Sequence, residues 1–355
     1  MKQINLMEIC QPIGSFYMGK MLAKNLIEVK VVNRLQEGKG VQRLLKNGRV
    51  RAISLFCKDP DATFPTPIIL SVKSSDMKKI ADQNGIEVFE YDENVAFAEI
   101  LDGQHRIEGI KKSKLTDIEV PVIIMFDLSE EQKAYIFSTI NGNQERVNQS
   151  VIYELFGLFK TRSAYKTCHE IARALNSDSK SPFYRRLKML EKREYATETI
   201  SQNTFVTSLC RLITNTPQED AIALKQGKDI NINEKLAFSK YFKSGDDAVI
   251  LKILLNYFNA AKNVFPEEWD NTDEYILTKT VGFSGLMDAL NKIIPVGEKE
   301  GDLSEKFFRS IFEKYKNFLE ENGLRLTSED FQSSGAVKAR ISGDICEIAY
   351  SIFDK

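Results

Sequence analysis

The sequence has few residues of the kinds that build metal centres or disulfide frameworks. Among its 355 residues are two histidines, one tryptophan and five single cysteines, Cys10, Cys57, Cys168, Cys210 and Cys346. A structural zinc site needs clustered thiols and imidazoles, and a secreted disulfide scaffold needs densely spaced cysteines. Neither class fits this chain. Scattered thiols are typical of proteins in a reducing cytoplasm.

Long hydrophobic runs are also missing. Gln3, Asn5, Glu8 and Gln11 interrupt the region where a signal peptide would have its apolar core. No apolar segment approaches the roughly 20 residues that a membrane-spanning helix needs. The composition, 43% hydrophobic and 28% charged, is that of a folded chain long enough for two domains. We therefore expect a cytoplasmic protein with no membrane partner.

The charges nearly cancel, but they are not evenly spread. With 49 basic and 50 acidic residues, the net charge is −1, so no overall field attracts nucleic acid. Residues 20–51 nevertheless carry nine Lys or Arg against two Glu, and residues 160–193 carry ten against three acids. Segregated basic charge favours a polyanion partner such as DNA. Basic side chains that simply face water explain the same pattern.

The hydrophobic pattern changes along the chain. Four apolar runs have the length of a strand: 68–72, 88–91, 95–101 and 120–126. Turn residues 92–94 separate the second run from the third and predict a hairpin there. Helical patterns cover residues 18–26, 106–113 and 129–140, and the last begins with a capping box at Ser129.

From Val147 onward, apolar residues recur every three or four positions. The pattern predicts helices over 151–159, 205–213, 249–265, 283–294 and 303–319. It predicts breaks at Asn176–Pro182, Asn215–Asn233, Pro295–Asp302 and Thr327–Gly335. We expect an α+β protein with an α/β domain over residues 1–146 and an all-helical domain over residues 147–355.

The most specific stretch is Asp102-Gly103-Gln104-His105-Arg106, where a predicted strand meets a predicted helix. Amide groups at the start of a helix attract phosphate, and glycine lets an anion approach the backbone closely. The Arg106 guanidinium suits phosphate, and Gln104 could bond a phosphate or orient a water. Asp102 could act as a base or bind a cation. An ordinary Asp-Gly turn, with His105 packed and Arg106 paired to a nearby glutamate, explains the same residues.

This pentapeptide is the eponymous sequence of the DGQHR-domain proteins, which the chain resembles. They include the DndB family of DNA phosphorothioation systems and the DpdB proteins of deazaguanine DNA modification. The resemblance extends to the upstream segment Phe64–Leu70 and the downstream segment Ile136–Gln144. More distantly the chain resembles the ParB/sulfiredoxin superfamily, which implies a ParB-like N-terminal domain. Gln104 stands where sulfiredoxin has its catalytic cysteine, so reduction of sulfinic acids is not implied.

The resemblance implies roles for named residues. The phosphate contacts would come from the motif turn, through Gly103, Gln104, His105 and Arg106. Asp102 and Glu99 would lie close enough to hold Mg²⁺ or to position a water. Asn141 and Gln144 would close the same pocket from the end of the following helix, although a plain Asn-Gly turn explains them equally well.

A second basic cluster follows a turn-rich break. Ser181 could cap a helix that Pro182 opens, which would then present basic residues and Tyr184 on one element. These are the candidate contacts to the DNA backbone: Arg185, Arg186, Lys188, Lys192 and Arg193. A solvated basic face is the alternative. His169 lies in an apolar helical pattern and is predicted to be a packing or partly exposed residue rather than a ligand-binding one.

Three functions remain open at this stage. The leading hypothesis is a DNA-associated protein of a bacterial DNA-modification or anti-phage system that binds, and could hydrolyse, a nucleoside triphosphate such as ATP or CTP with Mg²⁺. The second is a non-enzymatic DNA-binding regulator of such a system. The third is a metal-dependent nuclease that uses Asp102 and Glu99. Its partners would be DNA and other proteins of the system, and exposed apolar faces in the helical half are compatible with a homodimer.

Overall fold

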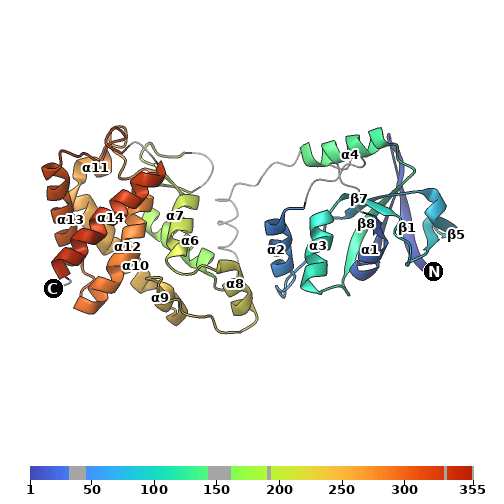
Figure 1. Cartoon of the computed structure of the whole chain (residues 1–355), viewed down its shortest axis with the longest axis horizontal. Coiled ribbons are helices and arrows are strands. Elements are labelled where there is room, and N and C mark those ends of the chain that lie inside the picture. The colour runs from blue at the N-terminus through green and yellow to red at the C-terminus, as the bar shows by residue number, and fades with distance from the viewer. Residues whose placement is uncertain (32–44, 143–160, 190–192, 332–333, 354–355) are drawn as a thin grey trace. The chain divides into compact units, whose positions relative to one another are not determined.

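The computed structural model describes residues 1–31, 45–142, 161–189, 193–331 and 334–353. Contacts divide the chain into two compact units, Met1–Arg146 and Val147–Lys355. The first unit combines a mixed sheet with helices, and the second is mainly helical (Figure 1). The predicted fold class, a sheet with helices followed by a helical part, is confirmed.

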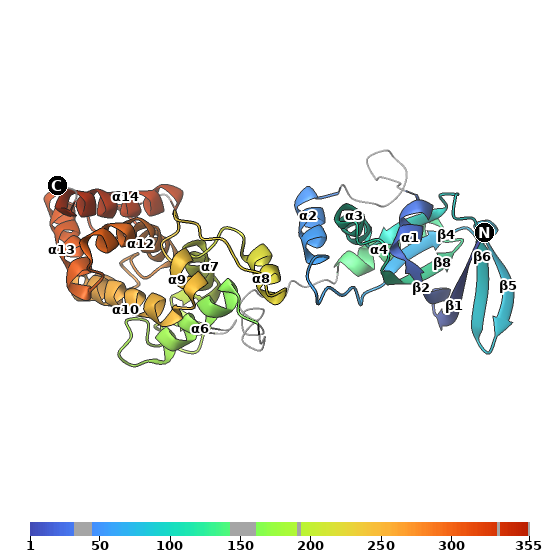
Figure 2. The ribbon, with the colours of Figure 1, turned by 90° about the horizontal axis from the view of Figure 1, so that it is seen from below.

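An eight-stranded sheet forms the centre of the first unit, with the strand order β3-β7-β4-β8-β2-β1-β6-β5. Figure 2 labels β1, β2, β4, β5, β6 and β8 of this sheet. The pairs β3–β7 and β4–β8 are parallel, and the other neighbours are antiparallel. The strands are β1 Lys2–Gln11, β2 Gly14–Leu22, β3 Lys30–Val31, β4 Ile68–Val72, β5 Met77–Gln83, β6 Ile86–Tyr91, β7 Ala98–Asp102 and β8 Glu119–Phe126. A short 3₁₀ turn at Ser74–Asp76 precedes β5.

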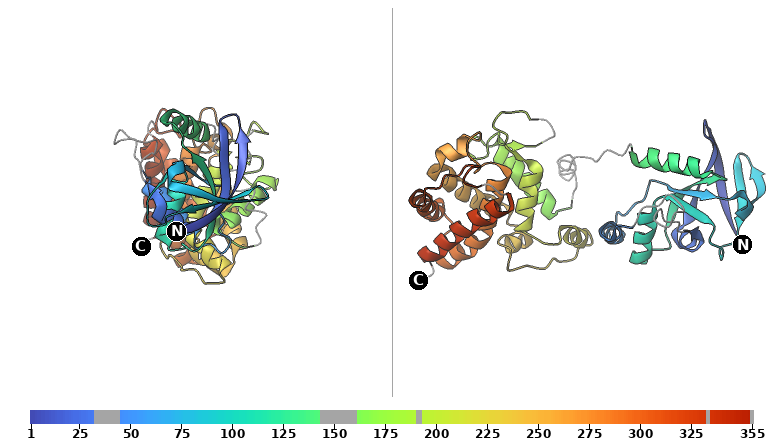
Figure 3. Two further views of the ribbon diagram at one scale, coloured as in Figure 1. Left: turned by 90° about the vertical axis from the view of Figure 1, so that its right-hand side faces the viewer. Right: turned by 45° about the horizontal axis from the view of Figure 1, so that its top comes forward.

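Helices lie on both faces of this sheet (Figures 1 and 3). In the described part of this unit the helices are α1 Ala23–Val29, α2 Asn47–Phe56, α3 Gln104–Ser113 and α4 Glu130–Gly142. The core of the unit lies on the side of α1 and α3, where Ile100 of β7 and Ile107 of α3 are both buried. Helix α4 covers the opposite face, so β7 carries a helix on each side.

The capping box predicted at the start of α4 is present. Gln132 donates its amide N–H to Ser129 Oγ at 3.2 Å, and Gln132 Oε1 accepts the Ser129 N–H at 2.9 Å. The helix ends at Gly142. This reciprocal pair satisfies two of the amides that a helix start leaves without a partner.

Two local predictions for this unit are wrong. Residues 88–91 and 95–101 do not form a hairpin, because β6 pairs with β1 and β5 whereas β7 pairs with β3 and β4. The burial patterns of the two strands differ accordingly. Side chains of β7 are buried almost throughout, whereas those of β6 alternate between buried and more exposed. Residues 18–22 belong to β2 rather than to a helix, because pairing with both β1 and β8 overrides their helical spacing.

The second unit packs its helices around one large core. Its elements are α6 Ala164–Ser177, β9 Leu187–Lys188, β10 Ile200–Ser201, α7 Gln202–Arg211, α8 Pro217–Lys225, α9 Ser239–Ser244, α10 Asp247–Val264, α11 Pro266–Asp270, α12 Thr280–Glu300, α13 Glu305–Glu321 and α14 Ser334–Phe353. Buried aromatic rings meet at the centre, where the ring of Phe183 lies 4.7 Å from that of Phe258 and 5.6 Å from that of Trp269.

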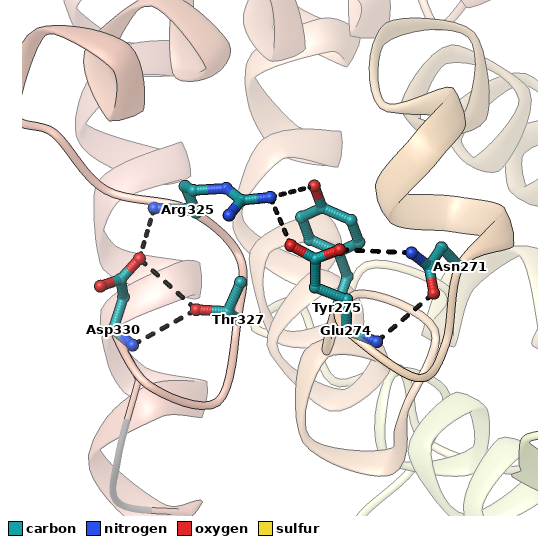
Figure 4. A network of polar contacts seen from close by, with 6 residues as sticks. All are labelled: Asn271, Glu274, Tyr275, Arg325, Thr327 and Asp330. Atoms are coloured by element: carbon teal, nitrogen blue, oxygen red, sulfur yellow. Dashed lines mark hydrogen bonds and ion pairs between the residues drawn. The ribbon is translucent and has the colours of Figure 1, made fainter.

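A surface network joins two loops of this unit (Figure 4). Tyr275 and Thr327 form an isolated antiparallel bridge. Arg325 donates to Glu274 and to the Tyr275 hydroxyl, and its backbone N–H donates to Asp330 Oδ2 at 2.7 Å. These contacts hold the segment before α14 against the segment that follows α11.

Three sequence predictions for the helical unit have different outcomes. Helices are present at four of the predicted segments, as α7, α10, α12 and α13. The break at Pro295–Asp302 is wrong at its start, because α12 continues through Pro295 to Glu300. Buried neighbours such as Ile294 and Val296 offset the lost hydrogen bond, which costs about 3 kcal/mol in a helix. Segment 151–159 lies outside the described residues.

Within the described part of the chain, none of the helices combines the length and the apolar character that crossing a membrane requires.

Candidate functional site

The motif residues 102–106 lie where β7 ends and α3 begins. Gly103 occupies the N-cap of α3 with φ of 102°, a left-handed conformation that L side chains rarely adopt. A Cβ at this position would lie 2.4 Å from Ile68 Cδ1 of β4. The backbone angle favours glycine, and any larger residue would also have to displace the terminal methyl group of Ile68. The predicted strand-turn-helix arrangement is therefore present.

Arg106 fastens this turn to the segment before β4. Its Nη2 lies 2.6 Å from Asp102 Oδ2 and donates to the Pro67 carbonyl at 3.0 Å. Its Nη1 donates to the Thr66 carbonyl and to Thr66 Oγ1, the latter at 2.7 Å. The four terminal N–H groups of the guanidinium thus all have protein acceptors. Arg106 positions the turn, and it is not free to bind a phosphate as the sequence suggested.

His105 connects α3 to the start of α2. Its Nε2 accepts the backbone N–H of Lys46, the N-cap residue of α2, at 3.1 Å. The ring is neutral in this arrangement, with its proton on Nδ1. Burial lowers the pKa of His105, and the positive charges of Arg49 and Lys46 lower it further. Two helix starts and two cations therefore meet around one imidazole.

A close approach of two helices makes this meeting possible. A Cβ on Gly109 of α3 would lie 2.4 Å from Ile53 Cγ2 of α2. Any larger residue would push the helices apart and break the contact between His105 and the start of α2. Lys46 and Arg49 are exposed, and in the described ranges neither side chain is paired with a carboxylate.

That Asp102 and Glu99 share a metal ion stays a prediction. Each carboxylate is paired with a different cation. Asp102 pairs with Arg106 of α3, and Glu99 pairs with Lys133 of α4, with 2.8 Å between Lys133 Nζ and Glu99 Oε2. No group of three or more His, Cys, Asp or Glu side chains suited to a metal occurs among the described residues.

The other motif candidates are placed as follows. Gln104 is half-buried at the first position of α3, beside the amides that open the helix. Asn141 lies in the last turn of α4, and Gln144 lies outside the described residues. Arg106 pairs with neither Glu99 nor Glu108, the two glutamates that the alternative interpretation offered.

An apolar groove that the sequence did not reveal lies between α4 and the sheet. It has a volume of about 720 Å³ and is lined by residues including Ile69, Ile123, Met125 and Ile136. Ile69 pairs with Asp102 in the strand register, so the groove begins close to the motif turn. The sequence showed only that β4 and β8 are apolar. Apolar strands are also expected where a helix such as α4 packs on the sheet, so this signal did not indicate a groove.

The basic cluster of the second unit does not lie on a helix, which corrects the prediction. Residues 182–186 form turns, and Leu187 and Lys188 form β9. The Ser181 hydroxyl accepts the Phe183 N–H at 3.1 Å, so it stabilises a turn instead of capping a helix.

The basic side chains consequently have different environments. Arg186 is buried, donates to the Trp269 carbonyl at 3.0 Å and pairs with Asp270, so it cannot contact DNA. Arg193 donates to the Glu198 carbonyl at 2.8 Å. Lys188 is half-buried, Arg185 is exposed, and Lys192 lies outside the described residues.

His169 packs in the core, one of the two environments predicted for it. It is fully buried, and its Nδ1 lies 2.8 Å from Gln202 Nε2.

Comparisons with known proteins agree with the motif. The family model of DndB, described as DNA-sulfur modification-associated, matches residues 15–306. A search of curated proteins gives no match. One similar solved structure is the C-terminally truncated chromosome-partitioning protein ParB from Caulobacter crescentus complexed with CTP-gamma-S. It is 13% identical, with 66% of this chain and 91% of that chain covered and a TM-score of 0.29, a likeness too low to support an argument about fold or ligand.

Proposed function

Because the chain belongs to the DndB family of proteins associated with DNA sulfur modification, we propose that it is a DNA-associated component of such a system that binds a nucleotide at the β7–α3 turn. The modification would be phosphorothioation, and a part in anti-phage defence belongs to the same proposal. The phosphates would lie at the first turn of α3, beside His105. ATP and CTP are the nucleotides to test first.

One observation carries the proposal. The starts of α2 and α3 converge at His105, and the exposed cations Lys46 and Arg49 are close enough to lower its pKa. Helix starts carry partial positive charge, so two of them with two unpaired cations form a strongly anion-attracting surface. Among the described residues none accepts the Nδ1–H of His105, so this group can donate to a ligand. The triphosphate group is the negatively charged part of a nucleotide, so it is the part that this positive surface would bind.

Each motif residue then has a distinct role. Gly103 allows the ligand to approach the backbone, and Gln104 lies beside the amides that would receive the phosphates. Arg106 and Asp102 hold the turn in shape without contacting the ligand.

Binding, rather than hydrolysis, is what the residues support. Asp102 is the carboxylate nearest the turn, and its charge is neutralised by Arg106 at 2.6 Å. A carboxylate already paired with a guanidinium is a poor partner for Mg²⁺. We therefore do not retain the nuclease, and turnover of the nucleotide would need a group beyond those described.

A second function is favoured by the contacts of Arg106. A motif arginine that binds only its own protein fits a structural turn in a DNA-binding regulator without a nucleotide ligand. Such a regulator would bind an operator sequence specifically and catalyse no reaction. Nucleotide binding separates the two functions.

The test is thermal unfolding with ATP, CTP and GTP in the presence of Mg²⁺. A ligand at about a hundred times its dissociation constant adds about 2.7 kcal/mol of stability. We expect one nucleotide to raise the midpoint, and the shift to be lost in the double variant Lys46→Ala, Arg49→Ala. Arg51→Ala is the matched control, because Arg51 is exposed on the same helix about 200° around from Arg49. No shift with any nucleotide would favour the regulator.

A further inference from the structure

The second unit has a pocket of its own on its surface. It has a volume of about 570 Å³ and is lined by the end of α6, the turn after it and residues that follow β9. Two tyrosine rings, two guanidinium groups and one carboxylate contribute to its wall, those of Tyr184, Tyr195, Arg173, Arg185 and Glu194. The volume lies within the range of roughly 300 to 1,000 Å³ that is usual for small-molecule sites.

The backbone at Arg185 is held in an unusual conformation. Its φ is 55°, in the left-handed region that favours glycine. The Arg185 N–H donates to the Asn176 carbonyl at 3.0 Å, and its own carbonyl accepts the Thr197 hydroxyl at 2.6 Å. The Asn176 side-chain oxygen also accepts the next two amides, those of Arg186 and Leu187, at 3.0 and 2.9 Å. Strained backbone that several hydrogen bonds hold in place is concentrated at functional positions.

This conformation places the Arg185 guanidinium between two aromatic rings. Its Cζ lies 5.0 Å from the Tyr184 ring centroid and 4.6 Å from the Tyr195 ring centroid. Both rings are more than a third exposed, at 36% and 38%. Planar cations and aromatic faces of this kind stack on other flat groups as well.

The charge of Arg185 is available to a ligand. In the described part of the chain it is paired with no carboxylate, although Glu194 lines the same pocket. Its neighbour Arg186 shows the contrast, because that side chain is buried against Asp270. Arg173 adds a second exposed guanidinium to the wall. The pocket therefore offers flat surfaces for an aromatic ring and positive charge for an anion.

We propose that this pocket binds one unstacked nucleotide of single-stranded DNA. The base would stack against Tyr184 and Tyr195, and the adjoining phosphate would contact Arg185 and Arg173. A carboxylate ligand would contact the guanidinium groups alone, whereas a nucleotide also offers a flat base to the exposed parts of the two rings. DNA is chosen over RNA because the chain's family is associated with modified DNA. The site is independent of the β7–α3 turn.

The test is fluorescence anisotropy of the full chain with a labelled 12-nucleotide single strand and with its duplex. Loss of one aromatic ring on which a base stacks weakens binding about five-fold to 150-fold. We expect that loss in Tyr184→Leu and in Arg185→Gln, and no loss in Tyr184→Phe, which keeps the ring. Arg211→Gln is the matched control, because Arg211 is exposed at the end of α7 and does not line the pocket. The duplex should bind more weakly than the strand.

Four outcomes would overturn the proposal. Equal binding by the wild type and by both Tyr184→Leu and Arg185→Gln would show that the pocket holds no nucleotide. Equal loss in Arg211→Gln would assign the effect to general basic charge. A free deoxynucleoside monophosphate that binds as tightly as the strand would make the ligand a free nucleotide. Tighter binding of RNA of the same sequence would exclude DNA as the partner.

Discussion

Arg106 Nη2 lies 2.6 Å from Asp102 Oδ2, on either side of the turn that Gly103 makes between β7 and α3. The same guanidinium reaches the Thr66 and Pro67 carbonyls before β4. Two segments far apart in the sequence are thereby joined at the point where the proposed ligand binds. The most chemically suggestive pair of the motif therefore shapes the site, and the exposed cations of α2 supply its charge.

Loss of the Arg106 side chain should destabilise the first unit. Arg106→Ala removes the partner of Asp102 and leaves the Thr66 and Pro67 carbonyls without their donor. We expect the free energy of unfolding to fall by about 2–4 kcal/mol. Urea unfolding followed by circular dichroism measures it. Arg51→Ala should change it by less than about 0.5 kcal/mol, and an equally small effect of Arg106→Ala would contradict the positioning role.

Gly103→Ala should cost more than the same change at Gly85. Both glycines have a left-handed backbone, with φ of 102° and 84°, but only at Gly103 would a Cβ meet an atom, Ile68 Cδ1 at 2.4 Å. The backbone term is about 1–2 kcal/mol in each variant, and the clash adds about 1–3 kcal/mol at Gly103 alone. Urea midpoints of the two variants give the comparison. Equal losses would show that the turn relaxes away from β4.

The titration of His105 should report on the cations of α2. Burial, then Arg49 and Lys46, hold the His105 pKa below its ordinary value of 6.5. The unfolded chain therefore binds more protons in this range, so the His105 contribution to stability is present above pH 6.5 and declines as the pH falls through the folded pKa. An NMR titration of the ring should show Arg49→Ala raising this pKa. An unchanged value would place Arg49 too far away to act on a ligand.

Arg185 and Arg186 should give opposite phenotypes although they are adjacent. Arg186→Gln removes a buried donor from the Trp269 carbonyl and from Asp270, so stability should fall by about 2–3 kcal/mol. Arg185→Gln should lower the free energy of unfolding by about 1 kcal/mol at most, since its side chain is exposed and loses only its contacts with the Tyr184 and Tyr195 rings. The single tryptophan, buried in this unit, reports its unfolding by fluorescence. Equal stability of the two variants would contradict the assignment.

The sequence predicted where helices and strands lie better than it predicted which strands pair with one another. Apolar runs and the capping box at Ser129 located β4, β8 and α4, because those signals are local. Strand pairing is not local, so the sequence could not tell that β7 joins β3 and β4 instead of β6. Pro295 is a similar case, since the buried side chains around it outweigh a helix-breaking residue.

The candidate site shows the same limit. The motif spacing predicted the Gly103 turn. Nothing in the motif indicated that the Arg106 guanidinium would donate its hydrogen bonds to Thr66 and Pro67. Nor did it place Lys46 beside His105, because 59 positions separate them and only the packing of α2 on α3 joins them. Arg185 and Arg186 could not be told apart by sequence, since the left-handed turn alone decides which one is buried.

The most direct test of the anion site is calorimetric titration with adenosine, AMP, ADP and ATP, and with the cytidine series. If phosphates bind where α2 and α3 begin, affinity should rise with each added phosphate for one series, and Arg49→Ala should weaken the triphosphate about ten-fold or more. Arg51→Ala should leave it unchanged. Affinity that does not depend on phosphate number, or equal affinity in Arg49→Ala and the wild type, would contradict the account.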